Sequence, residues 1–288
     1  MKLFSALLLF VCCLPCHSDE PATASGGKNL FARKNLVAWC IVPFDAKDRS
    51  PKERAEMLVR LGLKHVAYDW RAKHVQEFED EILQYKEHGL NYFAFWDWHP
   101  SMEPLIRKHK IKPQIWKMMR NSTRATQEEK VKDAAEGLLP MVELTESLGL
   151  KLGIYNHGGW AGQPENMIAV AKYLRENHKA EHVGLVYNFH HGHEHMENFD
   201  SLMKQMKPWL HCLNINGMDD AAAVAADGNR KILDIGSGRH EIALLKTVRD
   251  SGYDGRIGIL DHRTQLDAEV SLKANMDGLR KLVRKNLK

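Results

Sequence analysis

The feature that most constrains this chain is an eightfold alternation of short apolar runs with longer, helix-forming segments. The apolar runs are rich in strand-forming residues and cover positions 36–42, 64–68, 91–95, 113–118, 151–155, 182–187, 210–215 and 256–260. The expected helices cover 50–62, 73–88, 102–109, 126–148, 164–178, 196–206, 240–251 and 267–284, with a loop at 219–230. Apolar strands that alternate with helices are typical of a buried parallel sheet. Eight such units in about 250 residues predict a single (β/α)8 TIM barrel.

The ends of the expected helices carry recognisable signals. Ser50 is a good N-cap, Pro51 suits the first turn, and Glu53 stands where a capping box places its acidic residue. Gly62 and Gly149 follow the last residues of two helices, as C-terminal glycines commonly do. No linker interrupts the alternation, so the sequence predicts one barrel domain over residues 35–288.

The first 24 residues have the organisation of a cleavable signal peptide. Lys2 precedes an apolar stretch at 3–11, and Ala22-Thr23-Ala24 fits a cleavage site, with a cut near Ser18 as the alternative. The apolar stretch is too short to span a bilayer. We therefore expect a signal peptide at 1–24, a polar tether at 25–34, and a secreted or periplasmic protein with no membrane partner after cleavage.

Charge and cysteine usage narrow the classes of partner. The formal net charge of +4 is mild and contains no block of like charges, which argues against a nucleic-acid partner. Beyond the expected signal peptide only Cys40 and Cys212 remain, each inside an expected strand. We expect both to be buried free thiols, because a disulfide framework uses more cysteines, placed in loops. A homo-oligomer is left open.

Polar and aromatic residues gather where the expected strands end. His190, His191, His193 and His195 fall within six residues after the apolar run at 183–186. In a β/α barrel the carboxyl ends of all strands meet on one face, where the active site lies. The substrate-binding residues expected on that face are Arg71, Trp96, Trp98, Trp116, Tyr155, Asn156, Trp160, Asn188, His190, Asn214, Asn216 and His262.

Indole walls combined with amides and carboxylates suit a hydroxylated ring. Aromatic faces pack on C–H surfaces while the polar groups satisfy hydroxyls, so a small-molecule carbohydrate is the expected ligand. The alternative is that several of these tryptophans fill the core. For catalysis we expect His157 or His191 as general base, with Asp69 or Asp261 as its partner. Lys117, with Arg71, is expected to stabilise a developing oxyanion.

Several motifs resemble a known group of barrels. The segments Tyr155-Asn156-His157-Gly158-Gly159, Asn188-x-x-His191, Asn214-Ile215-Asn216-Gly217 and Gly252-Tyr253-Asp254-Gly255-x-Ile257-Gly258-Ile259 are similar to the xylose isomerase-like TIM-barrel superfamily. More narrowly, Tyr68-Asp69-Trp70-Arg71 and Pro113-x-x-Trp116 resemble secreted sugar phosphate isomerase/epimerase-like proteins of planctomycete-type bacteria. The resemblance covers roughly residues 35–284. It implies a barrel that acts on sugars or cyclitols.

The resemblance also implies a divalent metal, such as Mn, Mg, Co or Zn, held by two Glu, an Asp and a His. This sequence departs from all four ligands, which fall on Tyr155, Asn188, Asn214 and Leu260 or Asp261. Asn and Tyr supply almost no ligand charge. The second-shell substrate His of the family is kept as His191. A rebuilt metal site from His157, His190, His191 or His193 with Asp261 or His262 stays open; the metal candidates are His191, His193 and Asp261.

Two functions of different classes follow. The first is an isomerase, epimerase or lyase that abstracts a proton next to a carbonyl, on a non-phosphorylated carbohydrate because the protein is expected to be exported. The second is a carbohydrate-binding barrel that has lost catalysis. A glycoside hydrolase, which needs two facing carboxylates, is left with Asp69, Asp97 and Asp261 as its candidates.

Overall fold

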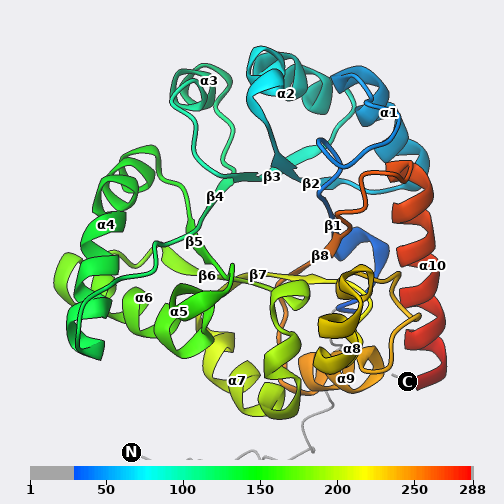
Figure 1. Ribbon diagram of the computed structural model, residues 1–288. Helices are drawn as coiled ribbons and strands as arrows, with labels where there is room; N and C mark the ends of the chain where they lie inside the picture. The colour runs from blue at the N-terminus through cyan, green and yellow to red at the C-terminus, as the bar shows by residue number, and fades with distance from the viewer. Residues whose placement is uncertain (1–28, 287–288) are drawn as a thin grey trace, which may run out of the picture.

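Eight parallel strands close into a barrel in strand order β1 to β8, so the predicted (β/α)8 TIM barrel is confirmed (Figure 1). The computed structural model describes residues 29–286; the expected signal peptide and residues 25–28 of the expected tether lie outside them. The strands are β1 Leu36–Trp39, β2 His65–Asp69, β3 Asn91–Trp96, β4 Gln114–Lys117, β5 Leu152–Tyr155, β6 Val183–Asn188, β7 Leu210–Ile215 and β8 Arg256–Leu260.

Helices surround the barrel, and α10 lies beside α1 where the ring closes (Figure 1). The eight that follow the strands are α1 Pro51–Leu61, α2 Phe78–Glu87, α3 Met102–His109, α4 Gln127–Leu148, α6 Pro164–His178, α7 Phe199–Met206, α9 Glu241–Asp250 and α10 Ala268–Asn286. The predicted capping box is confirmed: Ser50 and Glu53 exchange their hydrogen bonds, and Gly62 ends α1 with a φ of 68°. None of the helices at 29–286 is long and apolar enough to cross a membrane.

Local structure departs from the prediction at several loops. Two short helices, α5 Gly159–Gly162 and α8 Ala221–Ala226, follow β5 and β7, and α8 corrects the loop expected at 219–230. Five of the six α8 residues are alanine, the best helix former. The helices expected from 73 and 196 begin as 3-10 turns at Ala72–Glu77 and His193–Asn198. The first strand stops at Trp39 because Cys40 has a φ of 62°, outside the strand region.

Alternate strand residues belong to two separate cores. Val37 and Trp39 of β1 pack inside the barrel, whereas Leu36 and Ala38 pack in the layer between strands and helices. Successive side chains on a strand point to opposite faces, so this period of two also decides which strand-end residue reaches the mouth of the barrel. Cys212 in β7 and Cys40 just after β1 are buried free cysteines, as predicted.

A buried ion pair ties α1 to α2. Arg54 of α1 and Glu81 of α2 are both almost fully buried, and their side chains are in direct hydrogen-bond contact. Arg54 also donates to the carbonyl of Arg49 at 2.7 Å. Because both charges are removed from water, each depends on the other for compensation.

Candidate active site

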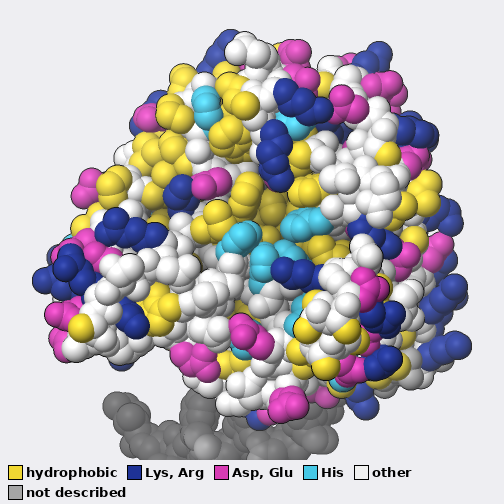
Figure 2. All heavy atoms as spheres, viewed as in Figure 1, with side chains coloured by type: hydrophobic (Ala, Val, Ile, Leu, Met, Phe, Trp, Pro, Cys, Tyr) yellow, Lys and Arg dark blue, Asp and Glu magenta, His cyan; other side chains and the backbone are white. Residues whose placement is uncertain are grey.

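A cavity of about 240 Å³ opens at the carboxyl ends of the strands. Figure 2 shows histidine side chains gathered around a depression with apolar side chains at its base, at the centre of the face seen along the barrel axis. The lining residues come from most of the strand ends and their loops: Trp39, Cys40, Phe44, Asp69, Arg71, Trp96, Tyr155, His157, His191 and His262. Of the residues predicted from the sequence, the structure brings together Asp69, Arg71, Trp96, Tyr155, His157, His191 and His262.

A closed circuit of side chains surrounds the cavity, each next to the following one; six of its members line the cavity, and His190 joins His262 to His191 without lining it. Ring-centroid separations of 3.6–6.3 Å, and guanidinium-to-ring distances of 5.3 and 5.9 Å, join its members. In order around the cavity they are Trp96, Arg71, Phe44, His262, His190, His191 and Tyr155. These seven members come from six strand ends far apart in the sequence, so only closure of the barrel can assemble them.

Asp69 is the carboxylate of the cavity lining. It is the last residue of β2, has an exposed fraction of 2%, and its Oδ1 has no hydrogen-bond partner among the described residues. Burial raises the pKa of Asp69 to about 7, and the nearby Arg71 charge opposes that rise only in part. At neutral pH this carboxyl is therefore divided between its acid and base forms, which suits a general base.

The imidazoles of the wall are neutral at physiological pH. Burial, reinforced by His157, lowers the pKa of His191 to about 3, and burial lowers the pKa of His262 to about 4. The pKa of His157 is also lowered, by burial and by the Lys231 charge. Nε2 of His191 is buried and has no partner among residues 29–286. A neutral imidazole carries one N–H, so these rings can donate a hydrogen bond to a substrate oxygen without bringing a charge.

Three asparagines fill the barrel just below the mouth. Asn188 donates its side-chain amide to Oδ1 of Asn156 at 2.8 Å, and Asn214 donates to Oδ1 of Asn188 at 2.6 Å. The thiol of Cys212 donates to Oδ1 of Asn214 at 3.6 Å. All three asparagines are completely buried. Each amide oxygen is thus engaged inside this asparagine ladder.

The asparagine ladder does not fit a divalent metal. Two of the positions that the resemblance aligns with metal ligands, Asn188 and Asn214, are uncharged and already accept hydrogen bonds. A third, Tyr155, has its pKa raised well above the usual value by burial and stays a neutral phenol. Divalent cations such as Mg²⁺ and Mn²⁺ prefer charged oxygen ligands. These residues therefore supply no charge that would hold a divalent metal.

The rebuilt metal site is not assembled either. Within residues 29–286 no three His, Cys, Asp or Glu side chains are grouped in a way that could hold a metal ion. Asp261 does not line the cavity. Its carboxylate accepts hydrogen bonds from Arg263 and from Ser271 of α10. Leu260 belongs to the core inside the barrel, so the next residue falls on the opposite face. His193 lies in the 3-10 turn behind His191 and does not line the cavity.

Other predicted contacts lie off the cavity. Trp116 is fully buried inside the barrel and donates its indole N–H to Gln114 at 2.9 Å, so it is a core residue. Trp98 packs against the core between strands and helices, and Trp160 of α5 donates to Gln127 at 2.9 Å. Lys117 pairs with Asp97 at 2.6 Å and does not line the cavity. Asn216 donates to the carbonyl oxygens of Gly217 and Lys231 and does not line it either. The other predicted binding residues that do not line the cavity are Asn156, Asn188, His190 and Asn214.

Three lining residues are not among the site residues expected from the sequence: Trp39, Cys40 and Phe44. Trp39 is two positions after the inward-facing Val37, so the period of two could have found it. Phe44 stacks on His262 with ring centroids 4.6 Å apart. It follows the first apolar run of the sequence, at 36–42, so its position after a strand end is the signal that could have found it.

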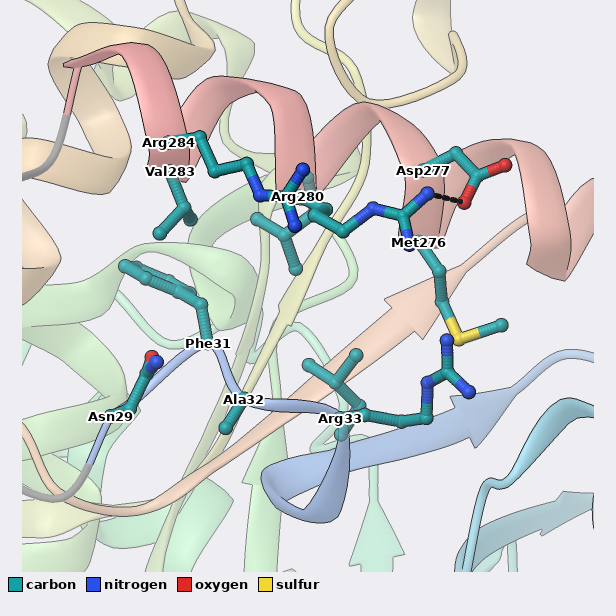
Figure 3. A pocket seen from close by; sticks show the side chains of 11 residues that line it. Asn29, Phe31, Ala32, Arg33, Met276, Asp277, Arg280, Val283 and Arg284 are labelled. Atoms are coloured by element: carbon teal, nitrogen blue, oxygen red, sulfur yellow. Dashed lines mark hydrogen bonds and ion pairs between the residues drawn. The ribbon is translucent and has the colours of Figure 1, made fainter.

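A second cavity, of about 310 Å³, lies at the start of the described chain (Figure 3). It is formed by the segment before β1 and by the C-terminal half of α10, and Leu36, the first residue of β1, lines it. Figure 3 shows three arginines, Arg33, Arg280 and Arg284, around apolar side chains that include Phe31 and Val283. This position is at the amino end of the strands, so we do not assign the active site to it.

The fold and the cavity at the strand ends define the class: a (β/α)8 barrel with its candidate active site on the carboxyl face. The sequence profile of the xylose isomerase-like TIM barrel family matches residues 28–282. The chain belongs to this family, which confirms the resemblance seen in the sequence. None of the curated proteins compared with the chain matches it.

Solved structures share the fold at low identity. The apo form of the 3-keto-D-glucoside 4-epimerase of E. coli is 15% identical, with a TM-score of 0.60 over 87% of this chain and 99% of that one. The IolI protein with a bound zinc atom is 12% identical, with a TM-score of 0.68 over 88% and 99%. A D-psicose 3-epimerase in the presence of D-fructose is 13% identical, with a TM-score of 0.58 over 87% and 97%. These likenesses establish the fold.

Proposed function

We propose that this protein is a sugar isomerase or epimerase that moves a proton next to a carbonyl of a non-phosphorylated carbohydrate, with Asp69 as the general base. The observation that carries the proposal is a buried carboxyl with a pKa of about 7 at a cavity walled by aromatic and imidazole rings. Sugar epimerases among the structures with this fold support the reaction class.

The residues divide the reaction between them. The Asp69 carboxylate takes a proton from the carbon beside the carbonyl, and the electron pair of the C–H bond moves onto the carbonyl oxygen. The N–H of a neutral imidazole, from His157 or His191, and the Arg71 guanidinium donate hydrogen bonds to that developing oxyanion. Return of the proton to the former carbonyl carbon, while the hydroxyl proton of the adjacent carbon moves to the former carbonyl oxygen, gives the isomer. Protonation of the original carbon on its opposite face by a water molecule, whose hydroxide then takes the proton held on Asp69, gives the epimer.

The loops after β7 and β8 support a substrate without a phosphate. Barrels that bind phosphate commonly use backbone N–H groups in these loops. Here the N–H of Arg263 is donated to Asp261 at 3.0 Å, and the N–H of Asp220 is donated to Asp219 at 2.9 Å. These backbone N–H groups are engaged by the adjacent carboxylates and are not free to bind a phosphate. The export predicted from residues 1–24 is part of the same proposal.

Solvent exchange tests the proposal. Protein treated with EDTA is incubated in D2O with a panel of free ketoses, aldoses and keto-sugars, and deuterium uptake at carbons next to the carbonyl is followed by NMR. We expect uptake for at least one sugar and a loss of ~100-fold or more in D69N, as for removal of a general base. The matched control D48N, at an exposed aspartate paired with Lys73, keeps the wild-type rate.

A non-catalytic carbohydrate-binding barrel is the second candidate, favoured by the uncharged asparagine ladder at the family's metal positions. Calorimetry with the same panel separates the two functions. Binding of a sugar without any deuterium uptake, in the presence or absence of added Mn²⁺, contradicts the isomerase and supports the binding protein.

A further inference from the structure

We infer that the carbohydrate bound in this cavity is a sugar acid, and that Arg71 binds its carboxylate. The inference rests on the proposed function, because it takes the same cavity as the sugar site. Four observations support it: the aromatic rings beside the Arg71 guanidinium, its lack of an ion-pair partner among the described residues, the positive charge around the mouth of the cavity, and the engaged backbone N–H groups of the adjacent loops.

Arg71 is held over the cavity by two aromatic rings. Its guanidinium carbon lies 5.3 Å from the ring centroid of Phe44 and 5.9 Å from that of Trp96. Its backbone N–H is donated to Nδ1 of His74 at 2.9 Å, which fixes the main chain at the end of β2. A guanidinium fixed between rings loses little freedom on binding, and its planar fork matches the two oxygens of a carboxylate.

The donors of this guanidinium are mostly free. Nη1 donates to the carbonyl oxygen of Trp70 at 2.7 Å, and Arg71 forms no ion pair in the part of the chain that the structure describes. Nearby cations differ in this respect. Lys73 pairs with Asp48 at 2.7 Å and Lys117 pairs with Asp97 at 2.6 Å. Arg71 therefore lines a cavity with an unmatched charge and a free pair of donors.

The charge balance at the mouth is positive. Lys231 also forms no ion pair among residues 29–286, and its charge lowers the pKa of His157 and His191. The opposing charge is Asp69, whose pKa of about 7 leaves it only partly ionised at neutral pH. Asp261 is neutralised by Arg263. With Arg71 lining the cavity, the Lys231 charge close to its imidazoles and one partly ionised carboxyl, the mouth favours an anionic ligand.

A carboxylate fits this anion site better than a phosphate. Phosphate sites are commonly built from several backbone N–H groups, often at a helix N-terminus. The N–H of Arg71 is used by His74, and those of Asp220 and Arg263 are used by aspartates. What remains at the cavity is one planar guanidinium. Its geometry matches a single planar anion carried by a ring that lies in the cavity.

Calorimetry with matched ligands tests the inference. The probes are the methyl glycosides of D-glucuronate, D-galacturonate and D-mannuronate, each compared with its neutral uronamide and with the 6-phosphate of the corresponding neutral sugar. In the series that binds most tightly, we expect the acid to bind ~10-fold or more tightly than the amide, because a hydrogen-bonded charge pair is worth more than a neutral one. R71Q removes this preference and R71K restores only part of it. K73Q, which removes a nearby paired charge, leaves it unchanged.

The results that would contradict the inference differ from those that would contradict the proposed function. Equal binding of acid and amide, equal weakening of both by R71Q, tighter binding of the 6-phosphate, or no binding of any acid each overturns the carboxylate assignment. Deuterium exchange with neutral sugars that depends on Asp69 leaves the proposed function standing while this inference fails. Tighter binding of the acid that depends on Arg71, without deuterium exchange, supports the carboxylate assignment while the proposed isomerase or epimerase function fails.

Discussion

Replacement of Asp69 by asparagine should stabilise the protein at high pH. The folded state raises the pKa of Asp69 from its ordinary value of 3.8 to about 7, chiefly by burial, so folding favours the protonated form. The stabilisation from the protonated Asp69 side chain is complete below the pKa that this group has in the unfolded chain, and it is lost as pH rises through about 7. A difference of about three pKa units corresponds to about 4 kcal/mol at 1.36 kcal/mol per unit. Asparagine has nearly the same shape and no charge to bury.

Urea unfolding of wild type and D69N at pH 4, 5.5, 7 and 8.5 measures this effect. We expect similar free energies of unfolding at pH 4, and an advantage for D69N that grows to about 2–4 kcal/mol at pH 8.5. The control D48N alters an exposed aspartate whose pKa is lowered by Lys73, so it shows no gain at high pH. Equal stability of D69N and wild type at pH 8.5, or a loss, would refute the raised pKa and with it the general base.

Two further substitutions test the barrel around the site. E81Q leaves the Arg54 charge buried without a counter-charge and should cost about 3–5 kcal/mol in urea unfolding, whereas the double variant R54M/E81L should lose less. A loss below about 1 kcal/mol for E81Q would show that water reaches the pair. G258A places a methyl group against Oδ1 of Asn214, closer than van der Waals contact, and should cost about 1–3 kcal/mol by disturbing the asparagine ladder. G228A meets open space and should change stability by less than about 0.5 kcal/mol. Equal effects of the two glycine variants would contradict the close packing of the ladder.

The barrel could be predicted because its signals are local. Strand runs, capping residues such as Ser50 and Glu53, and terminal glycines such as Gly62 act within a few residues, and the structure keeps all of them. The short helix α8 was missed because an alanine-rich hexapeptide has no apolar stripe that distinguishes it from a loop.

The site could be predicted only to the level of the strand ends. Asp69 and Trp96 end their strands on the inward face and reach the cavity. Asp261 is one residue out of phase with Leu260 and turns toward α10, a difference that the period of two encodes but that needs an exact strand end. Trp116 is inward-facing but lies too deep to reach the cavity. Lys117 depends on a partner, Asp97, that local sequence does not identify.

The most direct test of a metal-independent Asp69 base is the pH dependence of deuterium exchange by EDTA-treated protein on its best substrate. We expect the exchange rate to rise with pH with an apparent pKa of about 7, to level off above it, and to be unaffected by the chelator. Exchange that disappears with EDTA and returns with Mn²⁺, or a rate that does not change between pH 5 and pH 9, would contradict it.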